Sequence, residues 1–242
     1  MDILIYLERD NARVKYIFEH IFQHILGLDI VFTYDKHSFI NSESPKINYS
    51  KTVFSNELFF YSSDFLLNQN LKKEDLLINT YNDIKIFFLC NDSALPFDPF
   101  SASFYMLSRY EEYLSQKRDK FGRFCVEDSI AFKNHFLTQP IVDHWILFIK
   151  EKLLERFPEI HIKEHQFQFI NTIDIDNAYA YLEKGLFRSI AAFFRDVFQF
   201  NLKILSERIN VLFFQQKDPY DTYDKLLSIH NKYNLNTIFF FL

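Results

Sequence analysis

The 242-residue chain is 48% hydrophobic and 24% charged, a composition typical of globular proteins with one large or two ordinary domains. Its net charge of −5 argues against a nucleic-acid partner, because nucleic-acid-binding proteins usually present a basic face. The longest apolar runs, such as Ile84–Cys90 and Thr237–Leu242, fall far below the roughly 20 residues of a membrane span. Met1–Leu7 is too short for a signal peptide and lacks its basic segment, so we expect a cytoplasmic protein without a membrane span.

The chain opens with an alternation of strand and helix patterns. Ile3–Leu7 and Ile30–Tyr34 are short apolar runs that predict strands. A helix is predicted between them, beginning after Asp10 or Asn11 and ending before Gly27, where a glycine often terminates a helix. This β-α-β order favours a parallel sheet and an α/β fold.

Further elements of the first domain follow from caps and apolar runs. Ser38–Ser55 is polar and is predicted to be an irregular loop or a short hairpin, whereas Glu57–Tyr61 and Ile84–Cys90 are predicted strands. A helix is expected over Phe100–Leu114, because an aspartate and a proline precede it in cap positions. Pro140 predicts the start of another helix, which runs to about Arg156.

The pattern changes near residue 161, which predicts an N-terminal α/β domain over 1–160 and a second domain over 161–242. The elements expected in the second domain are a strand over Gln166–Asp176, a helical region over Tyr179–Ile209 with a break near Phe198–Asn201, a helix from Asp218 to about Tyr233, and a strand over Thr237–Leu242. The strand–helix–strand order again indicates parallel pairing.

The stretch Thr172-Ile173-Asp174-Ile175-Asp176-Asn177 carries the strongest chemical signal. Two carboxylates at positions i and i+2 of a strand point to the same face. The carboxyl end of a barrel strand is where α/β enzymes place catalytic groups, and a divalent metal relieves the repulsion between close carboxylates. The alternative, in which both residues cap the following helix or bind their neighbours, has about equal weight.

These residues resemble the first motif of the NodB-homology polysaccharide deacetylases, carbohydrate esterase family four, in its Thr-x-Asp-x-Asp form. Asn236-Thr237-Ile238-Phe239-Phe240-Phe241 resembles the second strand of that family. Upstream, Pro96–Phe100, Phe104–Tyr113 and Pro140–Asp143 resemble an uncharacterised N-terminal domain fused ahead of such barrels. The resemblance implies that residues 161–242 are the first β-α-β portion of a deacetylase-like (β/α) barrel.

By this resemblance, Asp174 is the general base and Asp176 is a metal ligand, and the metal is a divalent cation such as zinc. The implied reaction is hydrolysis of acetyl groups on a glycan or glycan precursor. The family also uses a His-x-x-x-His-type pair after the second strand, and the chain ends before that point. We therefore expect an incomplete metal site, an inactive fragment, and self-association through the exposed strand Thr237–Leu242. Asn177 stands where many members of the family have glycine or another acid.

Two histidine pairs were weighed as metal ligands. His161 and His165 lie in a segment that alternates like a strand, which places them about 13 Å apart, too far to share one ion. His20 and His24 share a face of the first helix, but no carboxylate or cysteine is evident to complete a zinc site. Solvated positions are the favoured interpretation for both pairs.

For the remaining charged groups, we weigh a structural role against a ligand-binding role. Arg109, Glu111 and Glu112 are favoured as a salt bridge over a ligand clamp, and Arg118, Lys120 and Arg123 are favoured as a solvated loop over an anion site. Nothing local supports a nucleophilic pair of Cys125 with His135. The sequence leaves two functions open, a deacetylase-like hydrolase or a non-catalytic binding module with a degenerate barrel.

Overall fold

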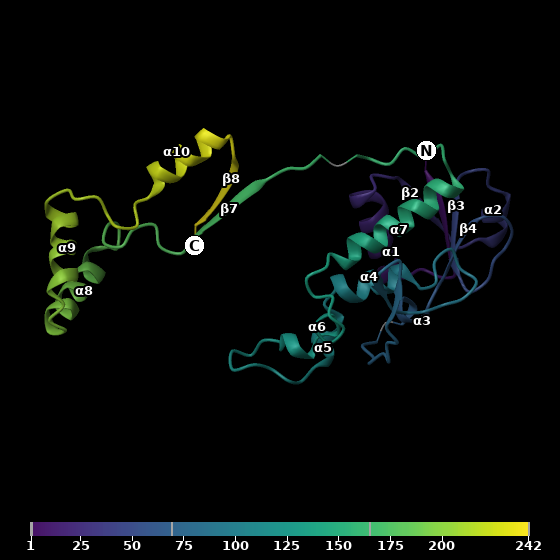
Figure 1. The fold of residues 1–242 in the computed structure, drawn as a ribbon, viewed down its shortest axis with the longest axis horizontal. Coiled ribbons are helices and arrows are strands. Elements are labelled where there is room, and N and C mark those ends of the chain that lie inside the picture. The colour runs from purple at the N-terminus through teal and green to yellow at the C-terminus, as the bar shows by residue number, and fades with distance from the viewer. Residues whose placement is uncertain (1, 69, 165, 242) are drawn as a thin grey trace. The chain divides into compact units, whose positions relative to one another are not determined.

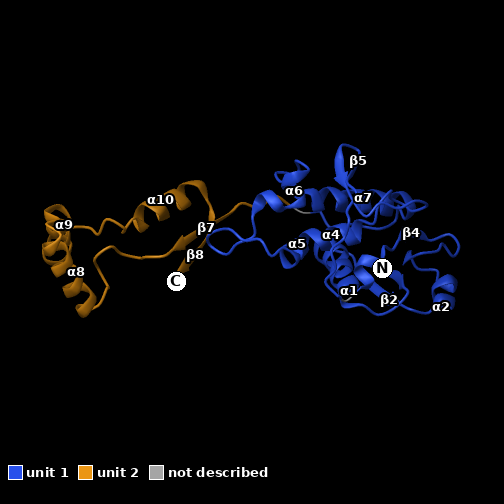
Figure 2. Ribbon diagram, turned by 90° about the horizontal axis from the view of Figure 1, so that it is seen from below, with its two compact units in different colours: residues 1–164 blue, residues 165–242 orange. Residues whose placement is uncertain are grey.

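The computed structural model describes residues 2–68, 70–164 and 166–241. The chain divides into two compact units, residues 1–164 and 165–242 (Figure 2). The sequence predicted the division at residues 160–161. Both units contain helices and parallel strands, so the predicted mixed α/β fold class is confirmed.

The first unit is built on a four-stranded parallel sheet with the strand order β2-β1-β3-β4 (Figure 1). Its elements are β1 (Ile3–Leu7), α1 (Ala12–Phe18), the π-helix η1 (Glu19–Ile25), β2 (Ile30–Thr33), α2 (Lys36–Asn41), β3 (Lys46–Ser50), β4 (Leu58–Tyr61), α3 (Asp64–Leu67), β5 (Asn79–Tyr81), β6 (Ile84–Ile86), α4 (Pro99–Leu107), α5 (Tyr110–Leu114), the 3₁₀ helix η2 (Val126–Asp128), α6 (Ile130–Lys133) and α7 (Ile141–Arg156). Strands β5 and β6 form a separate antiparallel hairpin.

The first helix begins where the sequence predicted, because the Asn11 side chain accepts hydrogen bonds from the backbone N–H groups of Arg13 and Val14. Its second half widens into a π-helix, in which the N–H of Leu26 donates to the carbonyl of Ile21 at 2.9 Å. Gly27 then turns the chain with a φ of 66°, a left-handed conformation that glycine adopts without strain.

Aromatic side chains fill the core between the sheet and its helices. The Phe100 ring on α4 stacks on Phe18 of α1, with a centroid distance of 4.0 Å. It also contacts Tyr49 of β3 and Phe60 of β4, each at 5.3 Å. On the other side of α4, the buried Trp145 of α7 donates a hydrogen bond to the carbonyl of Lys85 at 3.0 Å. The many phenylalanines of the sequence therefore act as core residues in this unit.

Three predicted elements of this unit are corrected. Ser38–Ser55 is not an irregular loop, since it contains α2 and the buried strand β3. The predicted strand Ile84–Cys90 is shortened to the three residues of β6, because Phe88 has a φ of 58°. The predicted helix Phe100–Leu114 breaks at Arg109, whose φ of 53° separates α4 from α5.

The second unit contains β7 (Ile170–Ile175), α8 (Leu186–Phe198), α9 (Leu202–Phe213), α10 (Tyr223–Tyr233) and β8 (Asn236–Phe241). Strands β7 and β8 are parallel, with Ile170 opposite Asn236 and Asp174 opposite Phe240. The predicted break between the two helices is confirmed at residues 199–201. None of the helices in the described part of the chain is long and apolar enough to cross a membrane.

Two boundaries of the second unit differ from the prediction. The first strand starts at Ile170 rather than at Gln166, and no regular structure occurs over residues 166–169. Asp218 does not cap a helix, since α10 begins only at Tyr223. The Asp218 carboxylate instead accepts hydrogen bonds from backbone N–H groups elsewhere, including those of Ala180 and Tyr181.

Candidate functional site

Asp174 and Asp176 lie at the carboxyl end of β7. Asp174 is the fifth residue of the strand, and Asp176 follows its last residue. Both side chains are exposed, as is that of Thr172, so alternate residues of this stretch face solvent as a strand requires. Neither carboxylate forms a hydrogen bond or an ion pair with the residues that the structure describes. Both carboxylates are therefore free to bind a ligand.

The opposite face of this two-stranded sheet is covered by α10. The buried His230 ring lies 5.9 Å from the ring of Phe239, and its Nε2 atom lies 3.2 Å from the side-chain amide of Asn171. Asn171 and Phe239 alternate with the exposed Asp174 and Phe240 along their strands. The helix thus leaves the face that bears Asp174 open among the described residues of this unit.

The segment that follows the two carboxylates is tied down by Asp218. Its carboxylate accepts hydrogen bonds from the backbone N–H groups of Ala180, Tyr181 and Leu182 at 2.8, 2.8 and 3.2 Å. The hydroxyl of Tyr223 donates to the carbonyl of Ala178 at 3.0 Å. The chain leaving the carboxyl end of β7 is consequently fixed by groups on or just before α10.

A hydrogen bond between Asn177 and Lys184 also holds the segment that follows β7. The side-chain oxygen of Asn177 accepts a hydrogen bond from Lys184 Nζ at 2.9 Å. Asn177 therefore has a partner within the loop, whereas Asp174 and Asp176 do not. This arrangement separates the residue that organises the loop from the residues that remain open to a ligand.

The donor chemistry of the two carboxylates suits a divalent cation, which prefers charged oxygen ligands. No group of three or more His, Cys, Asp or Glu side chains that could hold a metal ion occurs among residues 2–68, 70–164 and 166–241. These two carboxylates would therefore leave most of a coordination shell to other groups.

The histidine pairs remain apart from this site. His161 is exposed, and its Nδ1 atom lies 2.9 Å from the carbonyl of Glu159, while His165 lies outside the described residues. The rings of His20 and His24 on η1 are 6.1 Å apart, with no third ligand among the described residues. Burial and the neighbouring His24 lower the pKa of His20, which keeps that ring neutral near pH 7.

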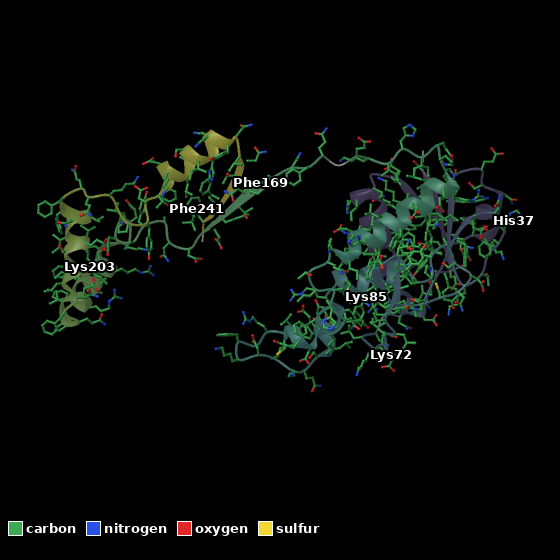
Figure 3. All side chains as sticks on the ribbon, in the orientation of Figure 1. His37, Lys72, Lys85, Phe169, Lys203 and Phe241 are labelled. Atoms are coloured by element: carbon green, nitrogen blue, oxygen red, sulfur yellow. The ribbon has the colours of Figure 1, made fainter. Side chains whose placement is uncertain are left out.

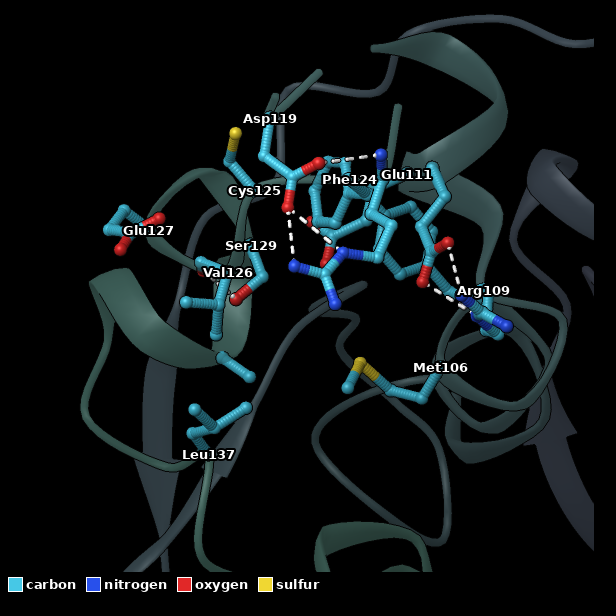
Figure 4. Close-up of a pocket in the computed structure, with 14 residues that line it drawn as sticks. Met106, Arg109, Glu111, Asp119, Phe124, Cys125, Val126, Glu127, Ser129 and Leu137 are labelled. Atoms are coloured by element: carbon cyan, nitrogen blue, oxygen red, sulfur yellow. Dashed lines mark hydrogen bonds and ion pairs between the residues drawn. The ribbon is translucent and has the colours of Figure 1, made fainter. Parts of the chain in front are cut away.

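A second candidate lies in the first unit, where a hollow of about 710 Å³ opens beside α4, α5 and η2 (Figure 4). It brings together Arg109, Glu111, Glu112 and Arg123, which the sequence placed in two separate groups. Arg109 forms two hydrogen bonds with the Glu112 carboxylate at 2.6 and 2.5 Å. The Arg109 side chain is 72% exposed, so this is a surface ion pair and not the buried or interface salt bridge that was predicted. Arg123 pairs with Asp119 at 2.8 Å.

The inner wall of this hollow contains Tyr105, a residue for which the sequence predicts no separate role. Tyr105 is 7% exposed, and its hydroxyl forms no hydrogen bond with the described residues. Burial and the nearby charge of Glu111 raise the pKa of this hydroxyl. Burial also raises the pKa of Glu111, although its carboxylate accepts a hydrogen bond from the N–H of Ile130 at 2.9 Å. No sequence pattern marks these two residues as a pair.

The remaining cations and the cysteine do not assemble into a reactive group. Arg118 donates to the carbonyl of Glu112 at 3.0 Å, and Lys120 lies 4.8 Å above the ring of Phe121. Neither lines the hollow, so the three cations do not gather into the anion site that was the less favoured interpretation of this loop. Cys125 lines it, but His135 does not, and no contact joins these two residues in the described structure.

Comparison with known proteins gives one match. A family model described as a family of unknown function, DUF7033, matches residues 3–158. No curated protein and no solved structure matches the chain. The matched region contains the four-stranded sheet and the hollow, and it ends before β7.

Proposed function

The chain belongs to the DUF7033 family, a family of unknown function, and we propose that this family domain precedes part of a metal-dependent hydrolase. In this proposal, residues 165–242 form the beginning of a polysaccharide-deacetylase-like barrel. The substrate is an acetylated glycan or glycan precursor. Asp174 is the general base and Asp176 is a ligand of a divalent cation such as zinc.

The observation that carries the proposal is the position of the two carboxylates. They lie at the carboxyl end of β7, which pairs in parallel with β8 after a crossover of three helices. Enzymes with (β/α) barrels place their catalytic groups at this end of their strands. The two side chains are also exposed and free of partners in the described structure, as ligands for a cation and a water molecule must be.

In this proposal, two residues of the chain have chemical roles. Asp174 would take a proton from the attacking water, which is the role of a general base. Asp176 would hold the cation by a carboxylate oxygen. When bound, the cation supplies positive charge that lowers the pKa of water and stabilises negative charge on the acetyl carbonyl oxygen. The backbone hydrogen bonds that the Asp218 carboxylate accepts would keep the loop after Asp176 in place.

The test uses the natural protein that contains this chain, incubated with zinc and chito-oligosaccharides, with released acetate as the readout. Asp174→Asn should lower the rate by roughly 100-fold or more, as loss of a general base does. Asp176→Asn should lower the bound zinc measured by atomic absorption. Asp224→Asn is the matched control, since this exposed carboxylate of α10 pairs, among the described residues, with Lys217 alone. Equal activity of the wild type and Asp174→Asn would exclude the proposed base.

A different observation favours a second candidate function, a non-catalytic binding module. The hollow of about 710 Å³ holds polar groups on an apolar wall, which is typical of small-molecule sites. The Tyr105 hydroxyl on its wall has no hydrogen-bond partner among the described residues and can donate to a ligand. A screen of sugars and nucleotides by thermal shift tests this candidate. The shift should disappear in Tyr105→Phe and persist in Tyr113→Phe, an exposed tyrosine outside the hollow.

A further inference from the structure

Helices α8 and α9 expose large apolar side chains to solvent. On α8, Phe187 is 88% exposed and Phe198 is 79% exposed, and on α9, Leu202 and Phe213 are 73% and 76% exposed. Between the helices, Ile190, Phe193 and Leu212 help to line an apolar groove of about 790 Å³. Phe200 in the connecting turn is exposed as well. A patch of this kind on one helical hairpin marks an interaction surface.

The apolar residues of α8 lie on one side of the helix. Their spacing of three, four and seven positions places them within a single stripe. The members of this stripe are Leu186, Phe187, Ile190, Phe193, Phe194, Val197 and Phe198. Arg188 and Arg195 are seven residues apart and share the opposite side. Helix α8 is therefore strongly amphipathic, with phenylalanine on its apolar side and arginine on its polar side.

The charge of this hairpin is opposite to that of the whole chain. Residues 186–213 contain four Lys and Arg side chains and two acidic side chains, a net charge of +2, whereas the whole chain carries −5. Both acidic residues, Asp196 and Glu207, have partners within the unit, Arg208 and Tyr181 respectively. The cations at Arg188 and Lys203 are exposed, and Lys203 lies on α9 (Figure 3).

We propose that the α8–α9 hairpin binds the surface of a membrane that contains anionic phospholipids. Interfacial helices combine a phenylalanine- and leucine-rich face with Lys and Arg on the polar face, and they lie in the plane of the bilayer surface. The basic side chains would contact the lipid phosphates while the apolar stripe enters the acyl boundary. With 13 residues, α8 is too short to cross a bilayer, in keeping with a helix that lies on it.

The charge argues for this partner over a second copy of the chain. Two hairpins that packed face to face would bring two net-positive surfaces together, and like charges at an interface are unfavourable. An anionic bilayer neutralises the same cations and covers the same apolar stripe. It therefore satisfies both features of the hairpin at once.

The experiment is sedimentation of the full chain with vesicles of phosphatidylcholine alone or of phosphatidylcholine mixed with phosphatidylglycerol. We expect tighter binding to the mixed vesicles, by roughly 100-fold if three cations contact the surface, and a decrease with added salt. The double variant Phe187→Ser/Phe198→Ser should weaken binding by roughly 10-fold or more, since two apolar contacts are lost. Arg188→Glu/Lys203→Glu should abolish the preference for the mixed vesicles.

Two matched variants control for general effects. Phe121→Ser removes an exposed phenylalanine from the first unit, and Lys225→Glu reverses an exposed charge on α10. Both should bind vesicles as the wild type does, and circular dichroism checks the folding of every variant. The proposal is overturned if the chain ignores vesicles, or if it binds both compositions equally. It is also overturned if the phenylalanine variants change only the oligomeric state in light scattering, which would identify a second copy as the occupant.

Discussion

The Asp196 carboxylate on α8 accepts two hydrogen bonds from the guanidinium of Arg208 on α9, from Nε at 3.1 Å and from Nη2 at 2.7 Å. Both side chains are buried, with exposures of 3% and 6%. The Arg208 guanidinium also lies 4.8 Å from the centre of the Tyr181 ring. Removing two charges from water is costly, so such a pair fixes orientation more than it adds stability. It holds together two helices whose apolar side chains are largely exposed.

Loss of one member of this pair should destabilise the second unit. Asp196→Ala leaves the Arg208 charge buried without its main partner, and we expect a loss of about 3–5 kcal/mol in the free energy of unfolding. The double variant Asp196→Leu/Arg208→Met should lose less than the single variant, because no buried charge remains. Hydrogen exchange of the α8 and α9 amides measures both effects. Asp224→Ala, which removes an exposed ion pair, should leave the exchange of these amides unchanged.

The stability of the second unit should depend on pH through Asp218. Burial raises the pKa of this carboxyl, but four backbone N–H donors outweigh burial, and the net result is a pKa below the ordinary value of 3.8. A lowered pKa in the folded state stabilises the protein above the ordinary pKa, and this contribution is lost as the pH falls through the folded value. As the pH is lowered, the free energy of unfolding measured with urea should fall less steeply for Asp218→Asn than for the wild type. Equal slopes would contradict this assignment.

Asp98 should be essential for the stability of the first unit. Its fully buried carboxylate accepts hydrogen bonds from the hydroxyls of Tyr49 and Ser101 at 2.8 and 2.6 Å, and from the N–H of Ser63 at 2.9 Å. Asp98→Ala leaves these buried donors unsatisfied, so we expect a loss of roughly 3 kcal/mol or more, measured by thermal unfolding. Asp75→Ala is the control. This side chain is exposed, and its removal should change stability by less than about 0.5 kcal/mol.

Two glycines allow a matched test of a close contact. Gly27 and Gly122 both have left-handed backbones, with φ values of 66° and 78°. A methyl group on Gly27 would lie 2.6 Å from Cβ of Lys163, whereas one on Gly122 would meet nothing within 4 Å. Gly122→Ala should therefore cost only the backbone strain of about 1 kcal/mol, and Gly27→Ala should cost clearly more. Thermal unfolding of both variants measures the difference. Equal costs would show that the chain near Lys163 moves aside freely.

The elements that the sequence predicted well are those with local signals. The Asn11 cap and the Gly27 turn fix both ends of the first helical segment, and neither depends on distant residues. The helix after Pro140 ends at Arg156 as predicted, because its apolar spacing is regular. The π-widening at His20 has no such signal, and it was not predicted.

Strand β3 escaped prediction because its buried polar residues find partners in the segment that follows the strand. The buried Asn48 donates to the Glu57 carboxylate and to the carbonyl of Thr52, each at 2.8 Å. The Ser50 hydroxyl also donates to the carbonyl of Thr52. Polar residues that are satisfied in this way can lie in the middle of a sheet, but in the sequence they resemble a loop.

The two candidate sites also differ in how far the sequence alone predicts them. The common exposure of Asp174 and Asp176 follows from the alternation of a strand, which the sequence displays directly. The hollow in the first unit requires the left-handed backbone of Arg109 and the return of the chain at Asp119 and Arg123. An arginine at positive φ is not a preference of the residue, so only the folded chain reveals this site.

The parallel pairing of Ile170 with Asn236 also determines the order in which the second unit forms. During synthesis, β7 can pair with β8 only after α8, α9 and α10 have been made, because these helices lie between the two strands in the chain. Contacts between residues so distant in the sequence form slowly, whereas helices form early. The phenylalanines of α8 are then exposed before any sheet exists, and a nascent chain in this state is a natural client for chaperones.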